Sequence, residues 1–211
     1  QEAVKFGANL PRQLKRLSLS LAENTEVSGE ERRLVLKELP ETLEWLSCRV
    51  HSLQWQVEGD ADLRLPGSLT SLRVTPYSGS NLYLLPLLPD SLVELLLKLS
   101  GRHATPLKEI PRGLRSLSLV SSNPHSHNRH YTRVSKELLA SLPPGLTELT
   151  LRGMVRSPVT DAELVAYLPR NLKYLSGFIL KAPVSAELAR ALPTQLPRVP
   201  STVLLEAIPV L

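Results

Sequence analysis

Three histidines lie close together in the segment SSNPHSHNRHYTR (121–133), and their spacing comes closest in this chain to a metal-binding pattern. In an extended segment His125 and His127 would point to the same side, and imidazole is a common zinc ligand. His130 follows, but the segment contains no cysteine or carboxylate that could complete a tetrahedral set. We therefore expect a solvated loop here, with a partner-contacting, pH-sensitive loop and a zinc site as the alternatives.

Other residue patterns that could carry out chemistry are missing from the sequence. The ten glycines form no dinucleotide-binding or phosphate-binding loop, and no Ser-His-Asp arrangement or paired zinc cysteines are recognisable. Cys48 is the only cysteine, and it takes a position at which the related stretches described below have Leu or Val. We interpret it as a core residue rather than a nucleophile. The sequence thus predicts a protein that is not an enzyme and uses no cofactor or metal.

The composition indicates a chain whose core is made of leucine. Of 211 residues, 42% are hydrophobic but only 4% are aromatic, and 18 prolines are spread at near-regular intervals. The formal net charge is +5 with both signs interspersed, so a nucleic-acid partner is allowed but not favoured. A single cysteine permits no internal disulfide, which favours an intracellular protein, with a secreted effector as the alternative.

No membrane-spanning pattern is present, because no apolar run approaches the ~20 residues that a helix needs to cross a bilayer. The sequence starts at Gln1 without a basic and apolar signal region, so we expect this start to be an artificial boundary or a processing site. The apolar stretch 203–211 is expected either to cap an exposed core or to continue into further chain.

A pattern of the form [L/I]-P-x-x-L recurs through the chain. Eight copies are spaced 22–32 residues apart, and they begin at Leu10, Leu39, Leu65, Leu88, Ile110, Leu142, Leu168 and Leu192. In the first seven copies the pattern continues as L-x-x-L-x-[apolar or small], as in LPDSLVELLL (88–97). Self-similarity over this many copies indicates a solenoid built from stacked repeats.

Each copy predicts a chain break followed by a short strand. Proline disfavours helix in the residue before it, and the L-x-L ending has the period of two that places alternate side chains on opposite faces of a strand. A strand of three or four residues cannot bury its own leucines, but stacked copies can share one core. A continuous amphipathic helix is excluded because a proline recurs in every copy. We therefore expect a parallel sheet with its leucines pointing inward.

The repeats resemble those of leucine-rich-repeat proteins over residues 10–191. The L-P-x-x-L-x-x-L-x-[L/V] form is similar to the repeats of bacterial effectors, and longer copies such as VTDAELVAYLPRNLKYL (159–175) resemble the F-box-associated subfamily. The resemblance implies an α/β solenoid, a horseshoe with a concave parallel β-sheet and short helices or extended segments on its convex side. We expect a single domain over 1–211, in which 192–211 forms a degraded terminal repeat or cap.

The segments between the strands are of two kinds. Four begin with Val-Ser or Val-Thr followed by acidic residues and leucines, which predicts helices of two to three turns in 27–40, 134–143, 159–169 and 184–193. Their N-cap residues would be Ser28, Ser135, Thr160 and Ser185. In the first and third of these helices, a glutamate three residues later fits a capping box. The other segments contain Gly or Pro and no caps, so we expect them to be extended or to form a single turn.

The residues that alternate with the inward leucines should form the concave face, with a middle column of mostly small, hydroxylated side chains. Small side chains in this column would let the surface of another protein approach the sheet closely. Aromatic residues beside arginine are typical of interface anchors. A basic stripe interrupted by two glutamates could meet carboxylates or phosphates. The partner-binding candidates are Trp45, Arg49, Arg73, Glu94, Leu96, Lys98, Glu148, Arg152, Tyr174 and Phe178.

The aromatic candidates also have a purely structural interpretation. Tyr174 and Phe178 could pack beneath the C-terminal cap, and Trp45 could pack along a neighbouring strand. Leu96 is the only large apolar residue expected in the middle column. If the concave face binds a partner, Leu96 lies at its centre.

These features predict a non-enzymatic module that binds a protein partner, as yet unidentified, on its concave face. One alternative is the substrate-recognition domain of a larger ubiquitin ligase or secreted effector. Another is a basic scaffold subunit of a ribonucleoprotein or organellar complex. The glutamates within the basic stripe argue against plain nucleic-acid binding.

Overall fold

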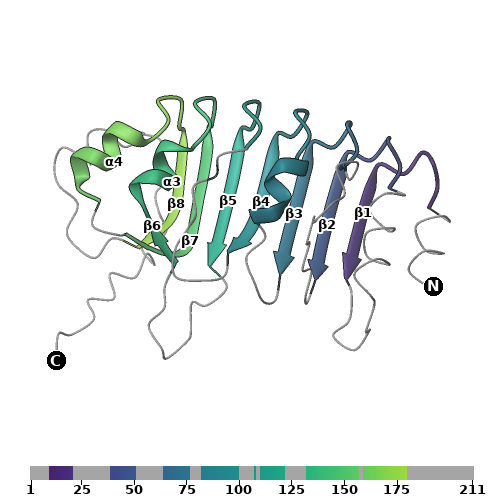
Figure 1. Cartoon of the computed structure of the whole chain (residues 1–211), viewed down its shortest axis with the longest axis horizontal. Helices are drawn as coiled ribbons and strands as arrows, with labels where there is room; N and C mark the ends of the chain where they lie inside the picture. The colour runs from purple at the N-terminus through teal and green to yellow at the C-terminus, as the bar shows by residue number, and fades with distance from the viewer. Residues whose placement is uncertain are drawn as a thin grey trace.

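The computed structural model describes residues 10–20, 39–50, 64–76, 82–99, 107, 110–121, 132–156 and 159–179. The predicted helices that begin at 27 and 184, the histidine segment 122–131 and the C-terminal 192–211 lie outside these residues. Figure 1 shows the described strands side by side along the long axis of the molecule.

One parallel sheet runs through the described part of the chain (Figure 1). Its eight strands are β1 (Arg16–Ser20), β2 (Trp45–Val50), β3 (Ser71–Pro76), β4 (Glu94–Leu99), β5 (Ser116–Ser121), β6 (Thr132–Val134), β7 (Glu148–Arg156) and β8 (Tyr174–Ile179). The strands pair in the order β1-β2-β3-β4-β5-β7, β6 also pairs with β7, and β8 pairs with the opposite edge of β7. A strand therefore follows each of the first seven repeats, and the parallel solenoid expected from the repeat is confirmed.

The [L/I]-P-x-x-L part of each repeat is a hydrogen-bonded turn. In all seven described copies, the backbone N–H of the motif's second leucine donates to the carbonyl of the proline three residues earlier, over 2.9–3.2 Å. Proline suits this position because the turn uses only its carbonyl, and it has no N–H that would be left unpaired. The turn reverses the chain just before each strand, which explains why the proline recurs.

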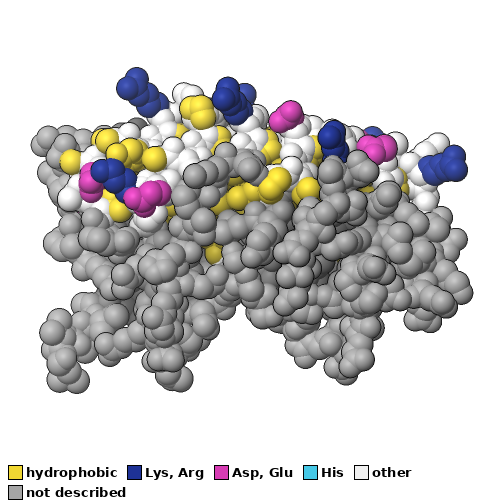
Figure 2. Space-filling view, viewed as in Figure 1, with side chains coloured by type: hydrophobic (Ala, Val, Ile, Leu, Met, Phe, Trp, Pro, Cys, Tyr) yellow, Lys and Arg dark blue, Asp and Glu magenta, His cyan; other side chains and the backbone are white. Residues whose placement is uncertain are grey.

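Charged side chains line the edge at which the strands begin. Figure 2 shows basic and acidic side chains interspersed along this upper edge of the molecule. The exposed charged residues at the third and sixth motif positions form what we call the rim: Arg12, Lys15, Glu41, Glu44, Asp90, Arg112, Arg115, Arg170 and Lys173. Within the rim, Lys15 Nζ lies 2.8 Å from Glu44 Oε1. Both side chains are exposed, so this ion pair contributes little to stability.

Just before each strand, one carbonyl per repeat accepts two hydrogen bonds from the next repeat. The carbonyl of Glu44 accepts from the N–H groups of Thr70 (2.9 Å) and Ser71 (3.0 Å), and the same arrangement recurs between all neighbouring described repeats. The hydroxyl of Thr70 adds a third hydrogen bond to that carbonyl, over 3.0 Å. These bonds satisfy backbone groups at the sheet edge and hold successive repeats in one register.

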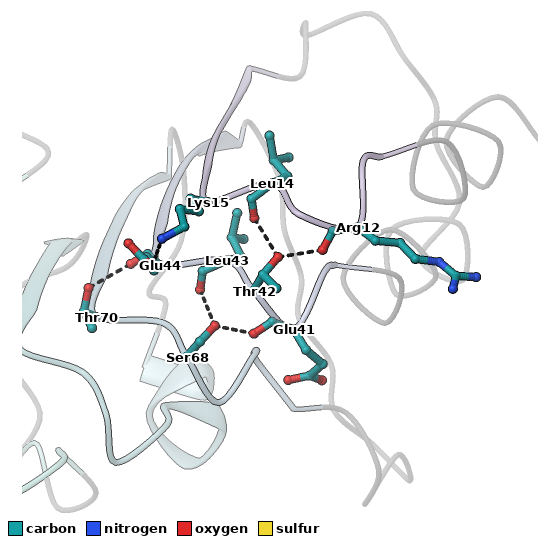
Figure 3. A network of polar contacts seen from close by, with 9 residues as sticks. All are labelled: Arg12, Leu14, Lys15, Glu41, Thr42, Leu43, Glu44, Ser68 and Thr70. Atoms are coloured by element: carbon teal, nitrogen blue, oxygen red, sulfur yellow. Dashed lines mark hydrogen bonds and ion pairs between the residues drawn. The ribbon is translucent and has the colours of Figure 1, made fainter.

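A row of side-chain hydroxyls forms a second link between repeats, from the residue that precedes the motif's second leucine. Thr42 Oγ1 donates to the carbonyls of Arg12 (2.7 Å) and Leu14 (3.1 Å) (Figure 3). The hydroxyl of Ser68 contacts the corresponding two carbonyls one repeat later, and Ser91 continues the row. Each hydroxyl thus bonds to the turn of the preceding repeat.

Replacing Gly145 by serine should raise the free energy of unfolding by about 1 kcal/mol, because it would extend this row of hydroxyls and reduce the freedom of the unfolded chain. Gly145 holds the same motif position in the sixth repeat, and its φ is not positive. A Cβ there would lie 3.7 Å from the carbonyl oxygen of Arg112, an ordinary contact. Urea unfolding measures the gain, with Gly145→Ala as the control. A serine variant no more stable than the alanine variant would show that the hydroxyl forms no bond.

The core lies on one side of the sheet and consists almost entirely of leucine. In each of the first six repeats three positions point into it: the second leucine of the turn and the two apolar residues of the strand. In the seventh repeat the third of these positions is Gly177. In the fourth repeat these are Leu92, Leu95 and Leu97, whose side chains are at most 2% exposed. Cys48 occupies the third of these positions in the second repeat and is buried, so its interpretation as a core residue is confirmed.

Short helices in the connections cover the leucine side of the sheet. They are the 3-10 helix η1 (Leu82–Leu87), α3 (Lys136–Ala140) and α4 (Asp161–Tyr167). Each contributes at least one leucine to the shared core, among them Leu85, Leu138 and Leu164. The opposite side of the sheet, which carries the alternate strand residues, therefore faces away from the core. The predicted helices in 134–143 and 159–169 are confirmed, although α3 has only five residues.

The N-caps of α3 and α4 are those predicted. Ser135 Oγ accepts a hydrogen bond from the N–H of Leu138 (3.2 Å). Thr160 and Glu163 form a complete capping box, in which the Thr160 N–H donates to Glu163 Oε2 over 3.0 Å. Lys136 Nζ lies 3.3 Å from Glu163 Oε1, which links the two helices. The hydrogen bond from the Thr160 backbone, together with that from Lys136, lowers the pKa of Glu163 below its ordinary value of 4.5.

The stability of the protein should therefore depend on Glu163 in acid. Because its pKa is lower in the folded state, the carboxylate stabilises the fold at pH values above 4.5, and this contribution is lost as the pH falls through the folded-state pKa. We expect Glu163→Gln to reduce the drop in Tm between neutral pH and about pH 3. Asp90→Asn, at an exposed turn position, is the control. An unchanged drop in the Glu163 variant would contradict this role.

The sheet departs from its regular pattern at β7. Gly153 and Gly177 both have positive φ (71° and 72°), and the pairing of β7 with β8 shifts between Thr150 and Met154. Beyond this bulge, the edge of β7 that pairs with β5 pairs with β6 instead. The prediction that segment 121–133 is a loop is thus wrong at both ends, because Ser121 lies in β5, and Thr132 and the residue after it lie in β6.

Candidate functional site

The side chains that alternate with the buried leucines form the concave face, in columns that run across the strands. The predicted first column is aligned by the strand register and comprises Arg16, Trp45, Ser71, Glu94, Ser116, Glu148 and Tyr174. The middle column is aligned in the same way and comprises Ser18, Ser47, Arg73, Leu96, Ser118, Thr150 and Ser176. The structure therefore brings most of the candidate residues onto one face.

The last column is aligned in two parts. Register pairs join Arg49 to Thr75, and they join Lys98 to Val120 and Val120 to Arg152. For Arg49, only the backbone is described.

Aligning the repeats places Phe178 next to Arg152 in the last column, and this prediction is wrong. Phe178 pairs with Met154, whose side chain is fully buried, because the bulge places extra residues in β7. For Phe178, as for Arg49, only the backbone is described.

The first column is organised in pairs across neighbouring strands. Arg16 Cζ lies 5.1 Å from the centre of the Trp45 ring, a cation–π contact. Ser71 Oγ donates to Glu94 Oε2 over 3.1 Å. The next pair repeats this arrangement, since Ser116 donates to Glu148 Oε2 over 3.0 Å. Both acidic groups of the face are thus hydrogen-bonded to the preceding strand, within the first column.

The two described aromatic candidates differ in exposure. Trp45 is half-buried, and Arg16 covers its ring. Tyr174 is 37% exposed and is, with Val93, one of two large apolar side chains among the described residues that are exposed. Tyr174 is therefore the aromatic side chain that a partner could reach with less rearrangement.

The middle column consists of serine and threonine side chains and two larger residues, Arg73 and Leu96. Ser47, Ser118, Thr150 and Ser176 are half-buried, and the hydroxyls of Thr150 and Ser176 lie 3.1 Å apart. Arg73 is exposed and Leu96 is half-buried beside it. The structure thus places Leu96 on the open side of the sheet, between the buried Leu95 and Leu97 of the same strand.

The described residues contain no candidate metal cluster, and their one cysteine is buried. No three of their His, Cys, Asp or Glu side chains are arranged to hold a metal ion. Burial raises the pKa of the Cys48 thiol to about 12, which leaves it protonated and without nucleophilic character at neutral pH. His125, His127 and His130 lie outside the described residues.

None of the helices in the described ranges is long and apolar enough to cross a membrane.

Sequence reasoning did not single out the rim. Its charges become visible as a set only when the third and sixth motif positions are compared, since these positions come together at one edge of the sheet. From the fifth repeat to the seventh the charged rim residues are all basic, and they are Arg112, Arg115, Arg170 and Lys173.

Two comparisons of the sequence found no relatives: no family model matches it, and no curated protein matches it. Two solved structures resemble the fold. One is a leucine-rich repeat-containing protein, LegL7, from Legionella pneumophila, with 16% identity and a TM-score of 0.47 over 83% of this chain. The other is CroV588, described as a circular leucine-rich-repeat protein, with 20% identity and a TM-score of 0.43 over 79% of this chain. The chain spans 60% of the length of LegL7 and 24% of that of CroV588.

Proposed function

We propose that this leucine-rich-repeat solenoid is a non-enzymatic module that binds a protein partner on its concave face. The observation that carries the proposal is the strand register, which aligns the first and middle columns across seven strands. Because the described helices contribute leucines to the core on the other side of the sheet, the columns form one continuous surface on which every described side chain except Ser71 is at least partly exposed. A surface of this kind suits a large partner better than a small ligand.

The chemistry of the face supports a protein as the partner. Serine and threonine side chains are short, so the backbone of a partner can approach the sheet closely and exchange hydrogen bonds with their hydroxyls. Tyr174 and the arginines are residue types that often anchor interfaces. Glu94 and Glu148 would repel the phosphates of a nucleic acid that ran across the strands. A folded protein can place its own basic groups opposite these two glutamates.

A triple variant of the face tests the proposal. Trp45→Ala, Arg73→Ala and Tyr174→Ala together should weaken the capture of a specific partner from cell extract, with little change in Tm because none of the three side chains is buried. The matched control removes three exposed side chains outside the columns, with Val93→Ala and the rim substitutions Arg112→Ala and Arg170→Ala. The proposal requires a protein that the wild type and the control capture and the triple variant does not. If all captured proteins bind the triple variant equally well, the face is not the binding site.

A further inference from the structure

We infer that the concave face recognises a partner segment in which an aliphatic side chain is flanked by two carboxylates. Four residues on adjacent strands would hold it: Arg73 on β3, Leu96 on β4, Val120 on β5 and Arg152 on β7. We call these residues the diagonal. The inference rests on the proposed function and adds to it the chemistry of the partner.

The strand register makes the diagonal continuous. Arg73 pairs directly with Leu96, and Val120 pairs directly with Arg152. Leu96 pairs with Ser118, so Val120 lies one strand across and two residues further along. Diagonal neighbours of this kind have Cα atoms about 8 Å apart, so one aliphatic side chain of a partner could contact both Leu96 and Val120.

The middle of the diagonal is apolar and partly open to solvent. Leu96 and Val120 are half-buried, whereas the residues that flank them in their own strands are buried. Leu96 lies between Arg73 and Ser118 in the middle column, and Val120 lies between Lys98 and Arg152 in the last column. An aliphatic side chain of a partner would cover their remaining exposed surface, which is favourable by about 25 cal/mol for each Å² removed from water.

The two ends of the diagonal carry available positive charge. Arg73 and Arg152 are exposed, and no hydrogen bond or ion pair to either side chain is found among the described residues. Each guanidinium can therefore bind a carboxylate by donating two parallel hydrogen bonds to it, the bidentate geometry that arginine favours. Lys98, which pairs with Val120, adds a third basic residue beside the apolar centre.

The acidic residues of the face do not cancel this charge. Glu94 and Glu148 lie in the first column, hydrogen-bonded to Ser71 and Ser116. The first column is about 13 Å along the strands from the last, where Arg152 lies. Arg152 thus lies on the other side of the face from the two acids, whereas Arg73 lies in the middle column, a diagonal step of about 8 Å from Glu94. A nucleic acid would use the arginines but would leave the apolar centre uncovered, so we favour a protein segment.

The size of the diagonal sets the length of the segment. Three steps between strands of about 4.8 Å, with an offset of two residues along the strands, separate the two arginine Cα atoms by about 16 Å. An extended segment covers this distance with about five residues, and a helix needs about eleven. The recognised segment is therefore short enough to be isolated as a peptide.

A library of displayed random peptides of about twelve residues, selected on the full chain, tests the inference. Selected peptides should carry carboxylates on both sides of an aliphatic residue. The double variant Arg73→Glu, Arg152→Glu should weaken their binding at least about tenfold. The double variant Arg112→Glu, Arg170→Glu, which reverses two exposed arginines of the rim, is the control and should retain binding. Leu96→Asp should also abolish binding, and circular dichroism verifies that each variant is folded.

The outcomes separate this inference from the proposed function. Neutral or basic peptides that depend on Leu96 would overturn the carboxylate chemistry and leave the face as a binding site. If every selected peptide binds all the face variants as well as the wild type, both the inference and the proposed function fail. The last measurement is the binding of a fluorescent single-stranded RNA of similar length to the full chain. RNA binding that depends on Arg73 and Arg152, with no acidic peptides selected, would also overturn the inference.

Discussion

Replacing Leu97 by alanine should lower the free energy of unfolding by about 2–5 kcal/mol, whereas the same change at its neighbour Leu96 should cost less than about 1 kcal/mol. Leu97 is 0% exposed and pairs with Val74 and Leu119 in the centre of the sheet. Its truncation leaves a cavity that the repeats on either side must share. Leu96 points to the concave face and leaves no closed cavity. Urea unfolding of both variants measures the difference.

This pair is a matched comparison, since the side chain, the substitution and the strand are identical and only the face differs. Similar losses of stability at both positions would mean that Leu96 belongs to the core, which would also remove it from the proposed binding surface. A small loss at Leu97 would contradict the assignment of the leucine side as a closed core. The expected result therefore tests the orientation of the sheet on which the functional proposals depend.

Replacing Gly177 by alanine should also be strongly destabilising, by at least about 2 kcal/mol. Its φ of +72° disfavours any side chain, which alone costs about 1–2 kcal/mol. In addition, a Cβ would lie 2.9 Å from the backbone N and Cα of Arg152, and backbone atoms can move away only if β7 and β8 separate. Thermal and chemical unfolding measure the loss.

Gly67→Ala is the control for this prediction. Nothing lies within 4 Å of a Cβ at Gly67, and its φ is not positive. Alanine there should leave stability unchanged or raise it by about 0.4–1 kcal/mol, through a less flexible unfolded chain. Equal effects at the two glycines would show that the bulge between β7 and β8 imposes no special conformation on Gly177.

Much of the fold could be predicted from local sequence. The turn needs only Pro40 and Leu43 of its own repeat, and the period of two in the following residues then determines which side chains face the core. Because each repeat contacts mainly its neighbours, aligning the motifs was enough to align the first and middle columns. The capping box of Thr160 and Glu163 is equally local, since its partners are three residues apart.

Interactions between repeats could not be predicted in this way, although their residues were known. The stacking of Arg16 on Trp45, and the hydrogen bond from Ser71 to Glu94, depend on rotamers that only a neighbouring strand can select. They determine how the concave face presents its charges. They fix the acidic groups in the first column and leave Arg73 exposed.

The sequence by itself determined the repeat, the parallel sheet and the side on which the leucines lie, because a period of two and a proline turn act within a single repeat. Only the tertiary structure decided where that regularity ends. Gly153 and Gly177 could adopt many conformations, and their positive φ follows from the fit of β7 between two strands on one edge and β8 on the other. As a result, Phe178 pairs with Met154 and not with Arg152, because backbone pairing between distant segments outweighs the alternation within a strand.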